Sequence, residues 1–146
     1  MVTVSIIIGS ESDRELGDAT ASQLREFGVW NELKTLSAHR NPKAIAHYVY
    51  STDAEVFIAI AGLSAALPGA IAALTVKPVI GVPKEVKLGG VDALLSMIQM
   101  PTGVPVATVG VDAAKNAALL AVEILAIGDE KLRQKLMEFR EKRAGG

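Results

Sequence analysis

Two short polar turns hold most of the residues in this chain that could carry out chemistry. The first, Gly9-Ser10-Glu11-Ser12-Asp13, follows the apolar run Val2–Ile8, and the second, Ser37-Ala38-His39-Arg40-Asn41-Pro42, follows the run Asn31–Leu36. Turns after neighbouring parallel strands lie side by side at the carboxyl edge of a sheet, where backbone N–H groups and helix dipoles attract anions. The sequence therefore predicts a site where hydroxyls, a carboxylate, an imidazole and a guanidinium meet. Such a set can hold a phosphorylated ribose and move a proton.

The first turn offers groups suited to a phosphorylated sugar. Gly9 lets a ligand approach the backbone, and the hydroxyls of Ser10 and Ser12 can donate hydrogen bonds. Asp13 can accept hydrogen bonds from ribose hydroxyls. The alternative is structural, because Ser12 and Glu15 form a capping-box pattern that an inert helix would also use. The dinucleotide and Walker glycine patterns are missing from this turn, which argues against an NAD site or a P-loop.

The second turn points more directly to catalysis. His39 and Arg40 precede the helix start Asn41-Pro42, which places both near the positive end of a helix dipole. Arg40 is suited to a phosphate, and a neutral His39 could take a proton from carbon. A histidine hydrogen-bonded to a loop carbonyl is the alternative for His39. His47 lies within a helical pattern, which favours a structural or solvated side chain.

A third loop, Gly62–Gly69, consists of small residues that could enclose a planar ring and exclude water. Close packing of a helix on the sheet explains the same residues equally well. Lys84 and Lys87 could attract an anionic substrate. Because lysines in a glycine-flanked loop are usually solvated, both stay outside the predicted site.

The composition limits the class of protein. The 146 residues, half of them apolar, fit one domain, 1–146. A net charge of −1 and a pI near 6.1 argue against nucleic-acid and anionic-membrane binding. With no cysteine and two histidines, we expect neither disulfides nor a metal site. No secretory leader or membrane span is evident, so we expect a cytoplasmic protein. The high apolar content fits subunit contacts as well as a large monomer core.

Strand-like and helix-like segments alternate along the chain. Apolar, β-branched runs predict strands over Val2–Ile8, Val56–Ala61, Pro78–Val82 and Val104–Val109, and Asn31–Leu36 is predicted as a weaker, more polar strand. Caps and helical periods predict helices between Ser12 and Gly28 and over Lys43–Tyr50, Gly69–Leu74, Val91–Ile98, Asp112–Ile127 and Glu130–Lys142. This alternation favours an α/β fold of three layers: a five-stranded parallel sheet in the flavodoxin-like order 2-1-3-4-5, helices on both faces and a C-terminal helical extension.

Several short motifs resemble, in order and spacing over nearly the whole chain, the small catalytic subunit of phosphoribosylaminoimidazole carboxylase. The matching segments are Gly9-Ser10-Glu11-Ser12-Asp13, Ser37-Ala38-His39-Arg40, Ala61-Gly62, Leu67-Pro68-Gly69, Gly81-Val82-Pro83, Gly90-Val91-Asp92, Gln99-Met100-Pro101, Gly103-Val104-Pro105-Val106 and Asn116-Ala117-Ala118-Leu119-Leu120. This resemblance implies a homo-octamer without cofactor or metal that acts on an aminoimidazole ribonucleotide and CO2 in de novo purine biosynthesis.

The resemblance also implies a role for each residue of the predicted site. His39 is the acid/base that takes the proton from ring carbon 4 after the N-carboxylate of the substrate has left as CO2. Phosphate and ribose bind to the turn residues, and the base and CO2 are enclosed by the third loop. The substrate-binding residues implied in this way are Gly9, Ser10, Ser12, Asp13, Ser37, Ala38, Arg40, Gly62, Leu63, Ser64, Ala66 and Leu67.

Three functions stay open at this level. Arg40, Pro68 and Gln99-Met100-Pro101 favour the branch that rearranges N5-carboxyaminoimidazole ribonucleotide, that is, a mutase. Ser64 and Ala66 favour the sister branch, which carboxylates aminoimidazole ribonucleotide directly with CO2, because the mutase branch usually has a histidine at the Ala66 position. A nucleotide-binding protein without activity is the third alternative, since this fold often binds ligands that it does not transform.

Overall fold

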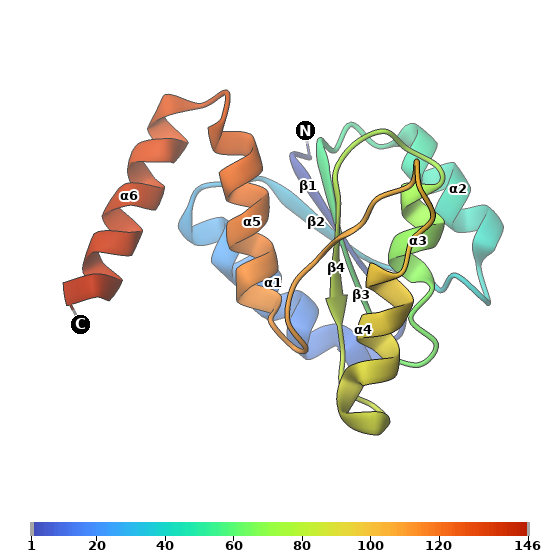
Figure 1. The fold of residues 1–146 in the computed structure, drawn as a ribbon. Helices are drawn as coiled ribbons and strands as arrows, with labels where there is room; N and C mark the ends of the chain where they lie inside the picture. Colours follow the sequence, from blue (N-terminus) through green and yellow to red (C-terminus); the bar gives the residue numbers. More distant parts are fainter. Residues whose placement is uncertain (1, 146) are drawn as a thin grey trace.

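The computed structural model of the chain describes residues 2–145, so Met1 and Gly146 of the expected domain lie outside the described residues. Strands and helices alternate as predicted (Figure 1). Their bounds, in chain order, are β1 Val4–Ile8, η1 Glu11–Asp13, α1 Arg14–Glu26, β2 Asn31–Thr35, α2 Pro42–Ser51, β3 Val56–Ala61, α3 Leu67–Ala72, β4 Val79–Pro83, η2 Leu88–Gly90, α4 Val91–Ile98, β5 Ala107–Thr108, α5 Ala114–Ala126 and α6 Glu130–Gly145.

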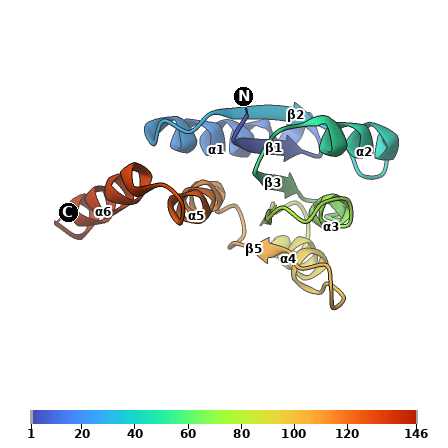
Figure 2. The same cartoon turned by 90° about the horizontal axis from the view of Figure 1, so that it is seen from above.

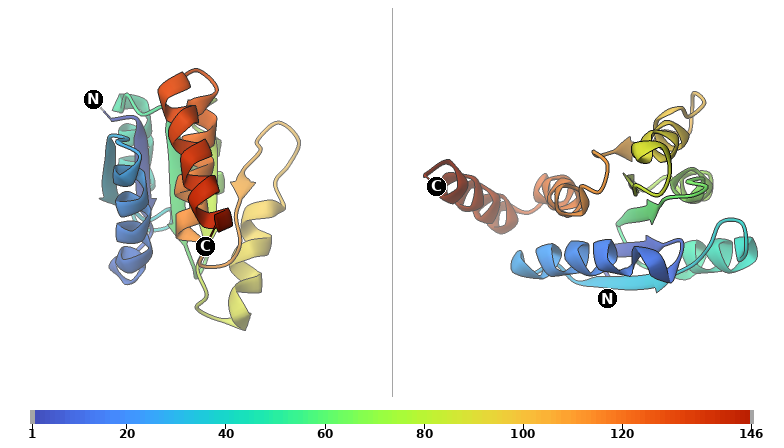
Figure 3. Two further views of the ribbon diagram at one scale, coloured as in Figure 1. Left: turned by 90° about the vertical axis from the view of Figure 1, so that its left-hand side faces the viewer. Right: turned by 90° about the horizontal axis from the view of Figure 1, so that it is seen from below.

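The sheet has five parallel strands in the order β2-β1-β3-β4-β5, which confirms the predicted flavodoxin-like topology. Helices cover both faces, with α1 and α5 on one side and α2, α3 and α4 on the other (Figures 1 and 2). The helix α6 lies on the outer side of α5 as the predicted extension (Figure 3). No helix within residues 2–145 combines the length and the apolar character that a membrane span needs.

The strand β1 shows why four of its five residues are apolar. Val4, Ile6 and Ile8 point into the apolar layer under α1 and α5, whereas Ile7 points into the layer under α2 and α3. All four side chains are fully buried. Because successive side chains of a strand alternate between faces, a strand covered on both sides needs apolar residues at nearly every position. Such a central strand holds the turn after Ile8 on a rigid support.

The start of α1 differs from the prediction. The capping box is formed by Ser10 and Asp13 rather than by Ser12 and Glu15, and it caps the short helix η1 that precedes α1. The reason is that the chain begins to turn directly after β1: Gly9 N still donates to Ile60 O, and the helical turn begins at Glu11. The C-terminal end of α1 is as predicted, because Gly28 adopts a left-handed φ of 71° that suits glycine.

Other segments also differ from their predicted bounds by a few residues, and for three of them the structure shows the reason. The last strand contains only Ala107 and Thr108, because Pro105 has no N–H to donate and Gly103 has a φ of 107°. The helix α3 begins at Leu67 rather than Gly69, with Pro68 in its first turn, where a proline is tolerated. The helix α5 begins at Ala114 rather than Asp112, because Asp112 has a φ of 59° outside the helical region.

Candidate active site

The ends of four parallel strands meet around a cavity of about 280 Å³ at the carboxyl edge of the sheet. All the residues predicted for the site line this cavity except Ala66, and Ala61 and Val86 line it in addition. The lining residues are Gly9, Ser10, Ser12, Asp13, Ser37, Ala38, His39, Arg40, Ala61, Gly62, Leu63, Ser64, Leu67 and Val86. Turns that are distant in the sequence are therefore brought together at one edge of the sheet.

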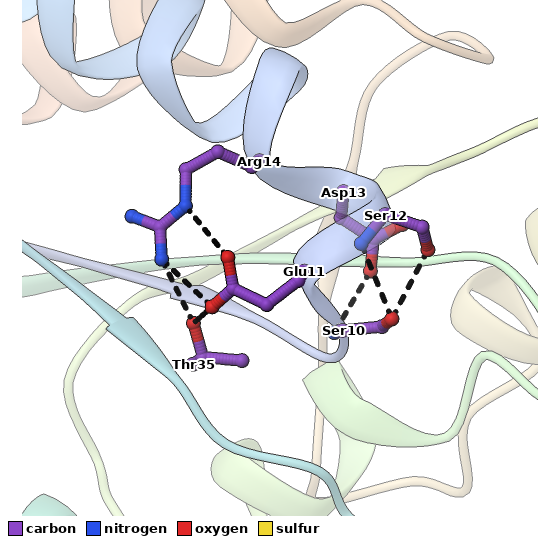
Figure 4. Close-up of polar contacts among 6 residues, drawn as sticks. All are labelled: Ser10, Glu11, Ser12, Asp13, Arg14 and Thr35. Atoms are coloured by element: carbon purple, nitrogen blue, oxygen red, sulfur yellow. Dashed lines mark hydrogen bonds and ion pairs between the residues drawn. The ribbon is translucent and has the colours of Figure 1, made fainter.

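Ser10 and Ser12 of the first turn line the cavity. Hydrogen bonds within the turn hold their side chains in a fixed arrangement (Figure 4). Ser10 N donates to Asp13 Oδ2 at 3.1 Å, and Ser12 N donates to Ser10 Oγ at 3.3 Å. The hydroxyl of Ser12 also donates to Ser10 Oγ, at 3.1 Å. These bonds fix the backbone of the turn, so both hydroxyls are held at the entrance to the helical segment, where anions bind favourably.

Hydrogen bonds between Thr35 and the Arg14–Glu11 ion pair link the first turn to the end of β2 (Figure 4). The Arg14 guanidinium donates to both carboxylate oxygens of Glu11, and Thr35 Oγ1 donates to Glu11 Oε1 at 2.7 Å. The hydrogen bond from Arg14, followed by that from Thr35, holds the pKa of Glu11 below its usual value. Because Thr35 ends β2 and Glu11 belongs to the first turn, this contact joins the first turn to the strand that leads into the second turn.

The second turn is closed by its own side chains. Arg40 N donates to Ser37 Oγ at 3.2 Å, and Asn41 N donates to Ser37 O at 2.8 Å. Asn41 occupies the cap position of α2 as predicted, but its side chain accepts from Ser37 N instead of capping the helix. The side chains of His39 and Arg40 are exposed and line the cavity, so both are accessible to a ligand.

The third loop forms the wall opposite the two turns. Gly62 is buried beneath the loop that follows β4, because a Cβ built on Gly62 would lie 2.4 Å from Val86 Cγ2. Leu63, which is 67% exposed, and Ser64 stand at the rim of the cavity. Ala66 is exposed and lies outside the lining residues. The side chain at position 66 therefore lies on the surface of the chain, next to residues of the cavity wall.

Lys84 was not included in the predicted site, and the structure places it against Asp13. Its ammonium lies 3.4 Å from Asp13 Oδ1 and donates to the carbonyl of Ser12. Burial raises the pKa of Asp13, whose side chain is 5% exposed, and the charge of Lys84 acts in the opposite direction. The signal for Lys84 was its position directly after a buried strand, at the same carboxyl edge as the polar turns.

Within residues 2–145, no group of three or more histidine or carboxylate side chains is arranged to hold a metal ion. The chemistry that the cavity offers consists of hydroxyls, one carboxylate, one imidazole and one guanidinium. This set is suited to holding an anionic ligand and moving a proton. Fold and cavity together define a flavodoxin-like α/β protein with a polar cavity, suited to an anionic ligand, at the carboxyl edge of its sheet.

Comparison with known proteins places the chain within one family of such proteins. Residues 3–145 match the model of the family described as AIR carboxylase, so the chain belongs to this family. It is 55% identical over 139 residues to N5-carboxyaminoimidazole ribonucleotide mutase of Methanocaldococcus jannaschii, an alignment that covers 95% of this chain and 88% of the relative.

A second relative and a solved structure agree with this assignment. N5-carboxyaminoimidazole ribonucleotide mutase of Pyrococcus abyssi is 51% identical over 145 residues, which cover 97% of this chain and 83% of the relative. The crystal structure of Treponema denticola PurE matches with a TM-score of 0.91 and 29% sequence identity, over 99% of this chain and 93% of that one.

Proposed function

We propose that the chain is an N5-carboxyaminoimidazole ribonucleotide mutase that acts in purine biosynthesis. The observation that carries the proposal is the convergence of His39, Arg40 and the two serines of the first turn on one cavity. The family match and the two mutase relatives support the same reaction. We further propose that the described fold is one catalytic domain, and the cytoplasmic location expected from the sequence stays a prediction.

The ribonucleotide phosphate binds between Ser10, Ser12 and Arg40. Two hydroxyls and a guanidinium provide the donors that a phosphate dianion needs, and the helical segment that begins at Glu11 adds its positive end. The glycine at position 9 supports this arrangement. A Cβ there would meet no protein atom closer than 3.8 Å, and Gly9 has no positive φ, so neither packing nor backbone conformation requires glycine. The space beside Gly9 is therefore available to the ligand.

The base lies against the third loop, with Gly62, Leu63, Ser64 and Leu67 around it. In the reaction, the bond between the carboxylate and the amino nitrogen attached to the ring breaks. CO2 leaves, and this nitrogen gains a proton. Ring carbon 4 then attacks CO2, and His39 removes the proton from that carbon. One proton is given to nitrogen and one is taken from carbon, so the rearrangement needs no net proton. A single histidine can serve both steps.

The choice of substrate separates the mutase from the direct carboxylase. The purified protein is supplied with N5-carboxyaminoimidazole ribonucleotide, or with aminoimidazole ribonucleotide and bicarbonate, and formation of the carboxylated ring is followed. We expect efficient turnover of the N-carboxylated substrate. Turnover of aminoimidazole ribonucleotide with bicarbonate, together with no turnover of the N-carboxylated substrate, would contradict the mutase and favour the carboxylase. Ser64 and Ala66 are the residues that make the second outcome worth testing.

The role of His39 is tested in the same assay. Because general acid/base catalysis contributes about 10²–10⁴-fold, H39N should lower kcat by at least about a hundredfold. His39 is exposed, so the melting temperature should not change. H47N is the matched control, since His47 does not line the cavity. A protein that only binds the nucleotide would show no activity in any of the three forms.

We also propose that the chain forms a homo-oligomer, with the octamer implied by the resemblance as its expected size. The support comes from an apolar surface on α4 and η2, here called the α4 surface. Its members are large apolar side chains that are 46% to 78% exposed, and they are Leu88, Val91, Leu95 and Ile98. Three of them recur at helical spacing on one side of α4. A contiguous apolar helix face of this kind marks a contact with another chain.

A further inference from the structure

The cavity contains a charge that works against the proposed ligand. Among the residues that line it, Asp13 is the one carboxylate and Arg40 the one full cation. The ribonucleotide brings a phosphate dianion to the same turn. An ionised carboxylate beside a phosphate repels it, and this repulsion is strong where water is excluded. The Asp13 side chain is 5% exposed, so little water surrounds it.

Asp13 is nevertheless needed in its present place. Its Oδ2 accepts the Ser10 N–H at 3.1 Å and thereby closes the capping box that shapes the turn. An apolar residue there would leave the Ser10 N–H without its acceptor. The turn therefore requires an acceptor whose negative charge is compensated from outside the turn.

Lys84 is positioned to supply that compensation. Its ammonium lies 3.4 Å from Asp13 Oδ1, the carboxylate oxygen that does not accept from Ser10, and it also donates to Ser12 O. The backbone of Lys84 is fixed as well, because Lys84 N donates to Ala61 O at 3.0 Å. The Lys84 side chain is 23% exposed and does not line the cavity. Its charge thus acts on the ligand through Asp13.

We propose that Lys84 is a positioning residue that neutralises the Asp13 carboxylate, so that the Ser10–Asp13 turn can bind a phosphate dianion. This inference rests on the proposed function for the identity of the ligand. The inference adds the segment after β4 to the site. This segment contributes the charge of Lys84, which the substrate itself does not contact. Because Asp13 is buried, loss of Lys84 would leave a buried negative charge without compensation. Exposed ion pairs differ in this respect, because their loss changes stability little.

The test is a double-mutant cycle on binding of aminoimidazole ribonucleotide, measured by calorimetry, with turnover followed separately. K84M leaves Asp13 uncompensated and should raise the Kd by roughly tenfold or more. K84R keeps the charge and should bind within about threefold of the unmodified protein. D13N removes the charge and keeps an oxygen acceptor, so K84M/D13N should bind within about threefold of D13N. K87M is the control, because Lys87 is exposed and makes no ion pair with a described residue.

Each outcome decides the inference. If K84M weakens binding by the same factor whether or not D13N is also present, Lys84 contacts the ligand directly and the inference is wrong. If K84M lowers only the melting temperature, the role of Lys84 is structural and the inference is again wrong. If K84M does not fold, folding and binding of K84M/D13N would support it, and failure of the double variant would overturn it.

Failure of the proposed function gives a different result. In that case the unmodified protein would not turn over the N-carboxylated substrate. The Kd values of the single and double variants could still be compared, and they would test the role of Lys84 by themselves. Absence of nucleotide binding by the unmodified protein would overturn both proposals together. A rise in KM with kcat within about twofold is expected for K84M in the turnover assay, because Lys84 acts on binding of the phosphate and not on the reacting carbon.

Discussion

At the scale of single residues, Gly62 and Val86 pack against each other at the wall of the cavity. A Cβ on Gly62 would lie 2.4 Å from Val86 Cγ2, so any larger residue at position 62 requires Val86 to move. Val86 in turn lines the cavity. The contact thus connects the packing of two loops with the space that is left for the base.

The substitution G62A should therefore damage both stability and binding. Overpacking of this kind costs about 1–3 kcal/mol, which equilibrium unfolding in urea at one protein concentration would measure. Substrate affinity should fall as Val86 is displaced. The double variant G62A/V86A removes the clashing methyl group and should recover most of both losses. G128A is the control, because nothing lies within 4 Å of a Cβ there. Equal losses in the single and double variants would contradict this explanation.

At the scale of elements, a buried hydroxyl network fixes α2 to the sheet. Tyr48 Oη lies 2.8 Å from Ser5 Oγ and donates to Glu32 Oε2 at 2.9 Å. Ser5 is fully buried in β1, and burial raises the pKa of Tyr48. Since α2 begins directly after the second turn, the network also determines where that turn lies.

Removal of one hydroxyl of this network should lower the free energy of unfolding more than removal of both hydroxyls. Y48F leaves the buried Ser5 hydroxyl without its partner, so we expect a loss of about 1–3 kcal/mol in unfolding free energy. The double variant S5A/Y48F should lie within about 1 kcal/mol of the unmodified protein. Y50F on the same helix is the control, because Tyr50 is 70% exposed. Strictly additive losses would show that the two hydroxyls do not act together.

The ion pair in the first turn of α6 predicts how the melting temperature changes at acidic pH. Arg133, followed by Gln134, lowers the pKa of Glu130 from its usual 4.5 to about 2. A carboxyl group with a lowered pKa in the folded state stabilises that state above its unfolded pKa, and it loses this contribution as the pH falls through the folded pKa. Between about pH 5 and 2, the melting temperature should fall less for E130Q than for the unmodified protein. An identical fall would mean that the pair does not contribute to stability.

The strand order and the positions of the helices could be predicted because they depend on long patterns in the sequence. Runs such as Val4–Ile8 and Val56–Ala61 are apolar almost throughout, and this pattern indicates a doubly covered strand wherever the exact ends lie. The errors arose where one residue decides the structure. Ser10 rather than Ser12 caps the first helical turn, and Pro105 shortens the last strand. These outcomes depend on the exact residue at which a strand ends, which a periodic pattern does not specify.

The candidate site also has features that the sequence predicts and features that it does not. Its polar turns could be identified because serine, histidine and arginine at the ends of strands are chemically distinctive. Lys84 and Val86 are absent from the predicted site. The position of Lys84 directly after a buried strand places it at the correct edge of the sheet, but the sequence does not show the carboxylate that it faces. The pairing of Lys84 with Asp13 joins residues 71 positions apart, and only the folded sheet brings the end of β4 beside the first turn.

At the scale of the whole molecule, the α4 surface is the feature that supports the proposed homo-oligomer. The substitution L95E places a charge in the middle of this surface, where Leu95 is 46% exposed. We expect light scattering to show a smaller particle than the unmodified protein forms, with the helical content unchanged. K115E on α5 is the control, because Lys115 is exposed and lies away from the α4 surface. An unchanged mass for L95E would contradict the proposed contact.

The measurement that tests the proposed function most directly is a crystal structure of the protein with aminoimidazole ribonucleotide. The proposed function predicts the phosphate on Ser10, Ser12 and Arg40, and the His39 imidazole about 3–3.5 Å from ring carbon 4, a distance suited to proton transfer. A nucleotide bound at another face of the chain, or a His39 ring turned away from the base, would contradict it.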